Sequence, residues 1–182
     1  MSQITEFKIK QTEIPGLLEI DISLMEDERG YFQEKFQKEK LVAAGFPESF
    51  TPVQQSVSYN KEVGVTRGFH AEPWEKYIAV ITGKAFGAYL DLRPGQNFGK
   101  IVTIELNPTK AVFLPRGVAN AFQTLTPDVY YSYLINAHWS SQAKYQSVNL
   151  KDPEIHIDWP INLAEAIISE KDLNNPFLKD FR

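Results

Sequence analysis

Residues 77–92 read YIAVITGKAFGAYLDL, two short apolar runs on either side of a Thr82-Gly83 turn. Such runs alternate apolar and polar positions and are rich in β-branched and aromatic residues, which is typical of β-strands. The pattern recurs outward along the chain, with turn residues such as Pro94-Gly95 between the runs. We expect strands at residues 18–22, 53–59, 77–82, 85–92, 101–106, 111–114 and 129–135. Short strands spaced by roughly 8–12 residues predict an all-β sandwich or barrel.

Two helices are expected beside the strands. One covers Gln37 to Ala44 and ends at Gly45, because glycine commonly terminates helices. The other covers Leu163 to Ser169. No internal repeat or change of composition marks a second domain, so residues 1–182 are predicted to form one domain, with the N-terminal region as a possible separate strand pair or arm.

Composition argues against several classes of function. The chain has 182 residues, a formal net charge of −4 with both signs scattered along it, and no cysteine. The charge pattern argues against nucleic-acid binding, and the lack of cysteine excludes disulfides, thiolate metal sites and cysteine nucleophiles. The three histidines fit no His-x-His or His-Glu-x-x-His motif, so no metal site is expected.

Hydropathy bears on where the protein is found. No apolar run approaches the ~20 residues of a membrane span. The N-terminus has no basic region followed by an apolar stretch, which a signal peptide would require. We therefore expect a cytoplasmic protein that does not bind membranes.

The stretch RGFHAEPWEK at residues 67–76 concentrates ionisable side chains at a strand end. His70 suits a general base because its unperturbed pKa is about 6.5, and Lys76 suits stabilisation of a developing oxyanion. An exposed hairpin with one surface histidine would explain the same pattern. Arg67 and His70 are three residues apart and point to opposite faces of a regular strand. Both can line one site only if the chain bends or bulges near Gly68.

Two further segments allow both a structural and a functional interpretation. Tyr131 and Tyr133 share a strand face, so one of them could donate a proton in an apolar cavity, and ordinary packing is the alternative. Asp172 follows the second expected helix and could orient His70 if the tail folds back onto the sheet. A solvated helix end is the alternative for Asp172.

A third segment, residues 26–34, is a charged turn that enters a strand. Phe32 and Glu34 fall on one face of that strand. A hairpin edge would explain this pattern without any function.

Several motifs occur in a fixed order through nearly the whole chain. They are Asp27-x-Arg29-Gly30-x-Phe32-x-Glu34-x-Phe36, Gln54-x-x-x-Ser58, Arg67-Gly68-Phe69-His70, Lys76-Tyr77, Asp91-Leu92-Arg93, Phe98-Gly99, Pro115 to Phe122, Tyr133, Ile157-Asp158-Trp159-Pro160 and Ser169-x-Lys171-Asp172. Each motif alone is weak, but in this order and spacing they resemble the dTDP-4-dehydrorhamnose 3,5-epimerases, nucleotide-sugar enzymes of the cupin superfamily.

The resemblance implies a fold and an activity. The fold would be a double-stranded β-helix, or jelly roll, of the cupin type with a few short peripheral helices, and the N-terminal 35 or so residues would contribute to a homodimer interface. The enzyme would be an isomerase of dTDP-L-rhamnose biosynthesis that needs no cofactor and no metal. It would exchange the protons at C3 and C5 of dTDP-4-dehydro-6-deoxy-D-glucose through an enolate to give dTDP-4-dehydro-L-rhamnose.

The resemblance also implies catalytic roles for four residues. His70 would be the base and Asp172 its carboxylate partner. Tyr133 would be the acid on the opposite face of the sugar. Lys76 would stabilise the enolate oxygen.

Nine further residues are expected to bind the substrate. Arg67 and Lys171 would meet the diphosphate, Gln54 and Ser58 would add neutral hydrogen bonds, Asn120 would line the site, and Trp139 would form an aromatic wall unless it only packs in the core. In the family, the segment equivalent to residues 29–34 reaches into the neighbouring subunit, so Phe32 would stack on the thymine, Glu34 would accept from its ring N–H and Arg29 would assist.

Three departures from the family pattern leave alternatives open. Asn120 stands where many members have histidine, Gly87 where many have aspartate, and the loop from His70 to Lys76 is shorter than usual. The first two occur together, so half of a charged pair is not left buried. The alternatives are an epimerase acting at C3 only, one acting on another nucleotide, and a cupin that binds a nucleotide sugar without turning it over.

Overall fold

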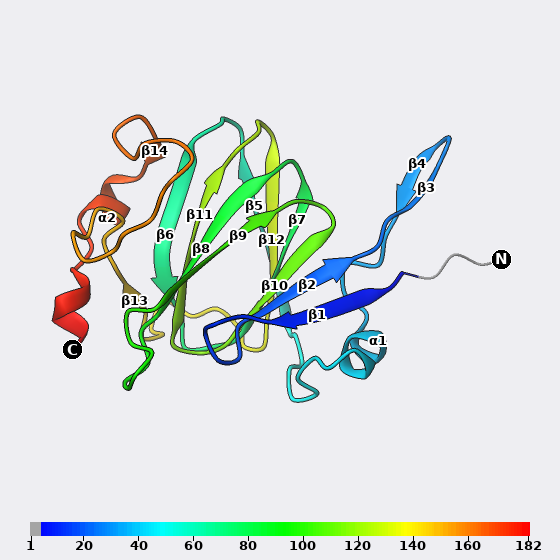
Figure 1. The fold of residues 1–182 in the computed structure, drawn as a ribbon, viewed down its shortest axis with the longest axis horizontal. Coiled ribbons are helices and arrows are strands. Elements are labelled where there is room, and N and C mark those ends of the chain that lie inside the picture. The colour runs from blue at the N-terminus through cyan, green and yellow to red at the C-terminus, as the bar shows by residue number, and fades with distance from the viewer. Residues whose placement is uncertain (1–4) are drawn as a thin grey trace.

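The computed structural model describes residues 5–182, and two β-sheets face each other across a core (Figure 1). The first sheet has the order β1-β2-β10-β7-β12-β5 and the second the order β13-β6-β11-β8-β9, with β14 beside β6. The strands of the first sheet are β1 (Phe7–Gln11), β2 (Leu18–Ile22), β5 (Gln54–Asn60), β7 (Lys76–Thr82), β10 (Lys110–Leu114) and β12 (Val129–Ile135). The strands of the second are β6 (Val65–Ala71), β8 (Ala85–Asp91), β9 (Ile101–Leu106), β11 (Val118–Thr124), β13 (Gln146–Ser147) and β14 (Ile167–Ile168).

From β5 to β12 the chain passes repeatedly from one sheet to the other. Strands β5, β7, β10 and β12 belong to the first sheet, and β6, β8, β9 and β11 to the second. All pairs among these eight strands are antiparallel. This arrangement is a jelly roll, as predicted.

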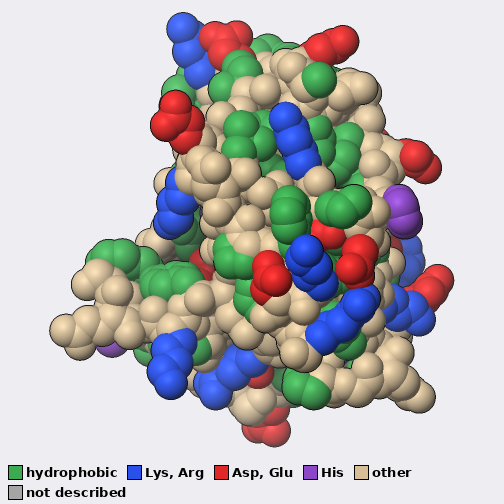
Figure 2. Space-filling model, turned by 90° about the vertical axis from the view of Figure 1, so that its left-hand side faces the viewer, with side chains coloured by type: hydrophobic (Ala, Val, Ile, Leu, Met, Phe, Trp, Pro, Cys, Tyr) green, Lys and Arg blue, Asp and Glu red, His purple; other side chains and the backbone are tan. Residues whose placement is uncertain are grey.

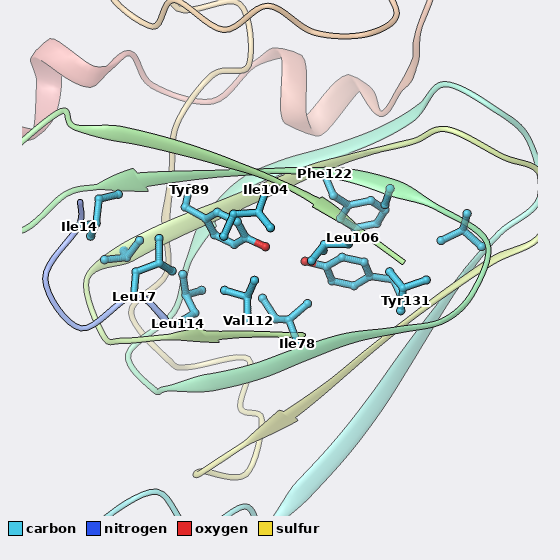
Figure 3. Close-up of a cluster of buried hydrophobic side chains, with 14 residues drawn as sticks. Ile14, Leu17, Ile78, Tyr89, Ile104, Leu106, Val112, Leu114, Phe122 and Tyr131 are labelled. Atoms are coloured by element: carbon cyan, nitrogen blue, oxygen red, sulfur yellow. The ribbon is translucent and has the colours of Figure 1, made fainter. Parts of the chain in front are cut away.

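Three clusters of buried side chains lie inside and on both outer faces of this sandwich. The central cluster fills the space between the sheets, and Figure 3 shows its side chains converging from strands of both. A second cluster packs residues around α1 (Lys38–Ala43) against the outer face of the first sheet. A third packs the C-terminal segment against the outer face of the second sheet.

Because both of its faces are covered, β11 has all seven residues buried and no alternating pattern. A strand at residues 118–124 was accordingly not predicted from periodicity, although the seven expected strands are all present within a few residues of their predicted ends. The short β1, β13 and β14 were also not predicted.

The helix expected at Gln37 to Ala44 is present as α1, and Gly45 follows it with φ +103°. The Gln37 side chain accepts a hydrogen bond from the Lys40 backbone N–H at 2.7 Å and caps the helix.

The helix expected at Leu163 to Ser169 is a wrong prediction. Residues 163–166 form a turn, in which the Asn162 side chain accepts from the Ala164 backbone N–H at 2.9 Å. Such a bond competes with helix formation, and the β-branched Ile167 and Ile168 instead pair with β6 as β14. The helix begins only at Glu170, as α2 (Glu170–Leu173), followed by a 3₁₀ turn (Leu178–Phe181).

The C-terminal segment places α2 over β6 (Figure 1). Figure 2 looks onto this side of the molecule, where acidic and basic side chains lie next to one another and apolar side chains are interspersed with them. At the other end, the hairpin of β3 (Met25–Asp27) and β4 (Gly30–Phe32) projects away from the sandwich (Figure 1). Within residues 5–182, no helix is long and apolar enough to span a membrane.

Candidate active site

A pocket of about 220 Å³ lies at one end of the sandwich and collects side chains from both sheets. Its base is apolar, and the rings of Phe122 and Tyr131 stack there with centroids 4.0 Å apart. Its polar lining comes from β5, β6, β7, β11, β12 and the loop after β6: Ser58, Arg67, His70, Glu72, Lys76, Asn120 and Tyr133. The pocket therefore places a few polar groups on an apolar base, which is typical of small-molecule sites.

His70 is held by Asp172, which lies 102 positions further along the chain. His70 Nε2 lies 2.8 Å from Asp172 Oδ1, and the Gly68 backbone N–H donates to Oδ2 at 3.4 Å. Asp172 is buried because the tail folds back onto β6, so the solvated helix end is not observed, and His70 beside it keeps 34% of its side chain exposed. Burial opposes ionisation of this carboxyl, but the bonds from His70 and Gly68 outweigh it and hold the pKa of Asp172 below its ordinary value.

β6 is irregular where it carries Arg67 and His70. Asn120 of β11 pairs with His70 and Phe122 pairs with Arg67, so two steps along β11 match three steps along β6. Gly68 lies within this step with φ +126°, a conformation that favours glycine. The predicted bend near Gly68 is present, and Arg67 and His70 both line the pocket.

Lys76 begins β7 and points its ammonium group into the site. Its Nζ donates to Asn120 Oδ1 at 2.9 Å, forms an ion pair with Glu72, and lies 5.6 Å from the ring centroid of Tyr133. The residue is only 5% exposed. Burial therefore lowers the pKa of Lys76, and Glu72 opposes that shift.

Tyr133 approaches from the opposite sheet to His70. It lies on β12, and it lines the pocket together with Tyr131, as expected for two residues on one strand face. A histidine on the second sheet and a tyrosine on the first thus face one pocket from two walls.

The predicted nucleotide ligands are only partly brought to the pocket. Arg67 donates through Nε to Asn60 at 2.9 Å, and Ser58 beside it also lines the pocket. Gln54 lies outside the lining and accepts from the Trp139 backbone N–H at 2.8 Å. Trp139 is 60% exposed, so it is not packed in the core, and Lys171 is an exposed residue of α2.

Comparison with known proteins identifies the family. The sequence profile described as dTDP-4-dehydrorhamnose 3,5-epimerase matches residues 11–180. The chain belongs to this epimerase family.

The relatives in this family include proteins named as 3,5-epimerases or RmlC and one named as a 3-epimerase. The RmlC homolog of Streptococcus pyogenes serotype M6 is 49% identical over 176 residues, covering 93% of this chain and 88% of that protein. A dTDP-4-dehydro-6-deoxyglucose 3-epimerase of a Streptomyces species is 31% identical over 159 residues, covering 84% and 79%. The solved structure of RmlC from Streptococcus suis in complex with dTDP-D-xylose has a TM-score of 0.91 and 48% identity, covering 97% and 93%.

The structure shows the surroundings of Asn120 and Gly87, the two positions where the sequence departs from the expected 3,5-epimerase pattern. A Cβ on Gly87 would lie 2.8 Å from the Tyr89 hydroxyl, so a larger residue here would require that hydroxyl to shift. Figure 3 shows the hydroxyls of Tyr89 and Tyr131 directed toward each other in the core. Asn120 Oδ1 accepts a hydrogen bond from Lys76 Nζ.

Three residues that are expected at the nucleotide, Arg29, Phe32 and Glu34, do not line this pocket. Arg29 is paired with Asp27 at 2.5 Å, and Glu34 is paired with Lys40. Phe32 is 64% exposed on the projecting β3–β4 hairpin. One subunit alone therefore does not bring these three side chains to the pocket.

Sequence reasoning missed Glu72. It lies in the stretch that was singled out, two residues after His70, and it is four residues before Lys76. No sequence pattern indicates this ion pair. It forms because the chain turns between β6 and β7 and brings Glu72 back to Lys76.

Proposed function

We propose that the protein catalyses the epimerisation at C3 and C5 of dTDP-4-dehydro-6-deoxy-D-glucose to dTDP-4-dehydro-L-rhamnose, an isomerase reaction of dTDP-L-rhamnose biosynthesis. The observation that carries the proposal is that the His70–Asp172 pair and Tyr133 face one pocket from different sheets, with Lys76 beside the tyrosine. Family membership and the dTDP-D-xylose complex of the Streptococcus suis relative support the substrate class.

His70 is the base in this proposal. Because an ionised carboxylate only accepts hydrogen bonds, Asp172 fixes the proton of the neutral imidazole on Nε2 and leaves the lone pair on Nδ1. Proton removal from carbon then turns the imidazole into an imidazolium, which the adjacent carboxylate stabilises.

Lys76 and Tyr133 complete the exchange. Proton removal beside a ketone builds negative charge on the carbonyl oxygen, and a lysine ammonium lowers the barrier by stabilising that charge. Tyr133 returns a proton to carbon from the wall opposite His70, which inverts the centre. Substrate and product are isomers, so the sequence of proton transfers needs no oxidant or reductant.

Arg67 is the proposed diphosphate ligand that the pocket itself contains. Arg67 lines the pocket together with Ser58 and His70, and cationic donors make strong bonds to phosphate oxygens. Lys171, an exposed residue one position before Asp172, would add a second positive charge to this site.

We also propose that the active unit is a homodimer. The β3–β4 hairpin projects from the sandwich and leaves Tyr31 half exposed and Phe32 mostly exposed, and a second copy would cover these side chains. β5 is an edge strand with Val57 and Tyr59 exposed on its outer face, and pairing of subunits there would cover an apolar edge. In such a dimer Arg29, Phe32 and Glu34 complete the partner's nucleotide site.

Incubation with dTDP-4-dehydro-6-deoxy-D-glucose in heavy water tests the activity. Deuterium at both C3 and C5 is the expected result. His70→Ala should abolish the incorporation and Asp172→Asn should reduce it severely, and near-normal incorporation by His70→Ala would exclude the assigned base.

A second candidate function, epimerisation at C3 only, is favoured by one observation: a relative that is 31% identical to this chain is named as a 3-epimerase. Deuterium at C3 alone identifies this activity. Tight dTDP-sugar binding without any incorporation identifies a binding protein.

A further inference from the structure

A second carboxylate, that of Glu72, lies in the pocket beside the His70–Asp172 pair. Its side chain is 15% exposed and forms an ion pair with Lys76. Lys76 itself is almost completely buried, and on its other side Asn120 Oδ1 accepts from Nζ at 2.9 Å. Two acceptors, one charged and one neutral, thus hold one buried ammonium group.

We propose that Glu72 is a positioning residue, which holds Lys76 as a cation at rest and, together with Asn120, takes up two of its three ammonium hydrogens so that the third is available to the substrate. The inference rests on the proposed function, because it explains how the enolate-stabilising lysine is kept charged.

The surroundings of Lys76 show why a carboxylate matters here. Arg67 and His70 reach the pocket from β6, Tyr131 and Tyr133 from β12, and Asn120 from β11. Arg67 and His70 contribute no negative charge, and the two tyrosines and Asn120 are neutral at physiological pH. Asp172 is engaged with His70. Among the described residues of the pocket, Glu72 is therefore the anion that forms an ion pair with Lys76.

The Glu72–Lys76 ion pair matters because the ammonium group of Lys76 is removed from water. A buried ammonium without a counter-charge loses its proton readily, and a neutral lysine cannot stabilise an enolate electrostatically. Burial lowers the pKa of Lys76, and Glu72 counteracts this through its charge and its hydrogen bond. Asn120 accepts one hydrogen but brings no charge.

The direct test follows the titration of Lys76 by NMR on protein labelled with ¹³C at lysine Cε, with the resonance assigned by Lys76→Arg. In Glu72→Gln, which keeps the shape of the side chain, we expect the midpoint of Lys76 to shift to lower pH. Superimposable titrations of Glu72→Gln and the parent protein would overturn the proposal.

A double variant separates charge from structure. Glu72→Gln combined with Asn120→Asp moves the carboxylate to the other partner of Lys76, and we expect the midpoint to return toward that of the parent. A double variant that titrates like Glu72→Gln would also overturn the proposal. Glu75→Gln is the matched control, because Glu75 lies in the same loop but accepts from Asn136 at 2.7 Å outside the pocket. It should leave the Lys76 titration unchanged.

Kinetics provide the second measurement. The kcat of Glu72→Gln should begin to fall at a lower pH than that of the parent, by about tenfold for each pH unit above the Lys76 midpoint. KM should stay near that of the parent, since a purely structural defect would change binding as well. The NMR titration does not require turnover, so a parent protein without epimerase activity would reject the proposed function and leave the result on Glu72 intact.

Discussion

At the scale of single residues, the proposed roles of Tyr133 as acid and His70 as base can be tested separately. The substitution Tyr133→Phe removes only the hydroxyl oxygen of the proposed acid. Tyr133 carries the proposed acid on β12, while the base and its carboxylate lie on β6 and α2. We expect Tyr133→Phe to retain proton abstraction but to lose productive return of the proton. The measured phenotype is deuterium exchange into the substrate without net inversion, and full turnover by this variant would contradict the role.

Lys35 is a second lysine whose positive charge is disfavoured by burial. Its Nζ donates to the Val80 carbonyl at 3.0 Å and to that of Pro108, and burial lowers its pKa to about 8 from 10.5. Between these two values the unfolded chain binds more protons than the folded one, so this group makes the free energy of unfolding rise with pH. Below about pH 8 the cost of the buried charge is fully present.

Lys35→Met removes this pH dependence. We expect the parent to gain stability relative to Lys35→Met between pH 7.5 and pH 10, measured by urea unfolding. Lys61→Met, which removes an ammonium from the surface, controls for the change in net charge. A constant difference between the parent and Lys35→Met across this range would contradict the prediction.

At the scale of elements, the bulge in β6 depends on Gly68. A Cβ at this position would lie 2.5 Å from the Cβ and 2.6 Å from the Cα of Ala121, so β6 and β11 could not keep their spacing. We expect Gly68→Ala to lower the melting temperature and to abolish activity by displacing His70. Gly95→Ala is the matched control, because Gly95 has the same φ of +126° but nothing within 4 Å of the added methyl group. Equal effects of the two substitutions would show that the close approach is not what matters.

How far each element could be predicted depends on what surrounds it. β12 has one face toward the core, so its alternation was visible in the sequence, whereas β11 is covered on both faces and has no period to detect. The second helix was misplaced because Asn162 competes for the backbone and Ile167 finds a partner in β6, and both effects depend on the fold.

In the candidate site, too, some features could be predicted from the sequence and others depend on the fold. His70, Lys76 and Tyr133 could be predicted because their types and their order along the chain resemble a family. The ion pair of Glu72 could not, because it depends on the turn between two strands. Nor could the sequence show that Trp139 is exposed and that its backbone N–H donates to Gln54.

At the scale of the whole molecule, the proposed homodimer predicts that two inactive variants can complement each other. His70→Ala lacks the base, and a Phe32→Ala/Glu34→Gln double variant lacks the contribution of the hairpin. A mixed dimer contains one intact site if the hairpin reaches into the partner, so part of the activity should return after subunit exchange.

Sedimentation should show a dimer at micromolar concentration. Inactive mixtures after proven subunit exchange, or a monomer in solution, would exclude the shared site without affecting the epimerase assignment.

The distance in sequence between His70 and Asp172 has a consequence for how the enzyme is made. The eight jelly-roll strands end at Ile135, so the sandwich can assemble on a nascent chain before Asp172 has been synthesised. His70, the proposed base, meets Asp172 only when the tail emerges from the ribosome and docks on β6. A message truncated before codon 172 would then yield a product in which His70 lacks its proposed carboxylate partner, and proteolytic trimming of the tail would remove that partner after synthesis.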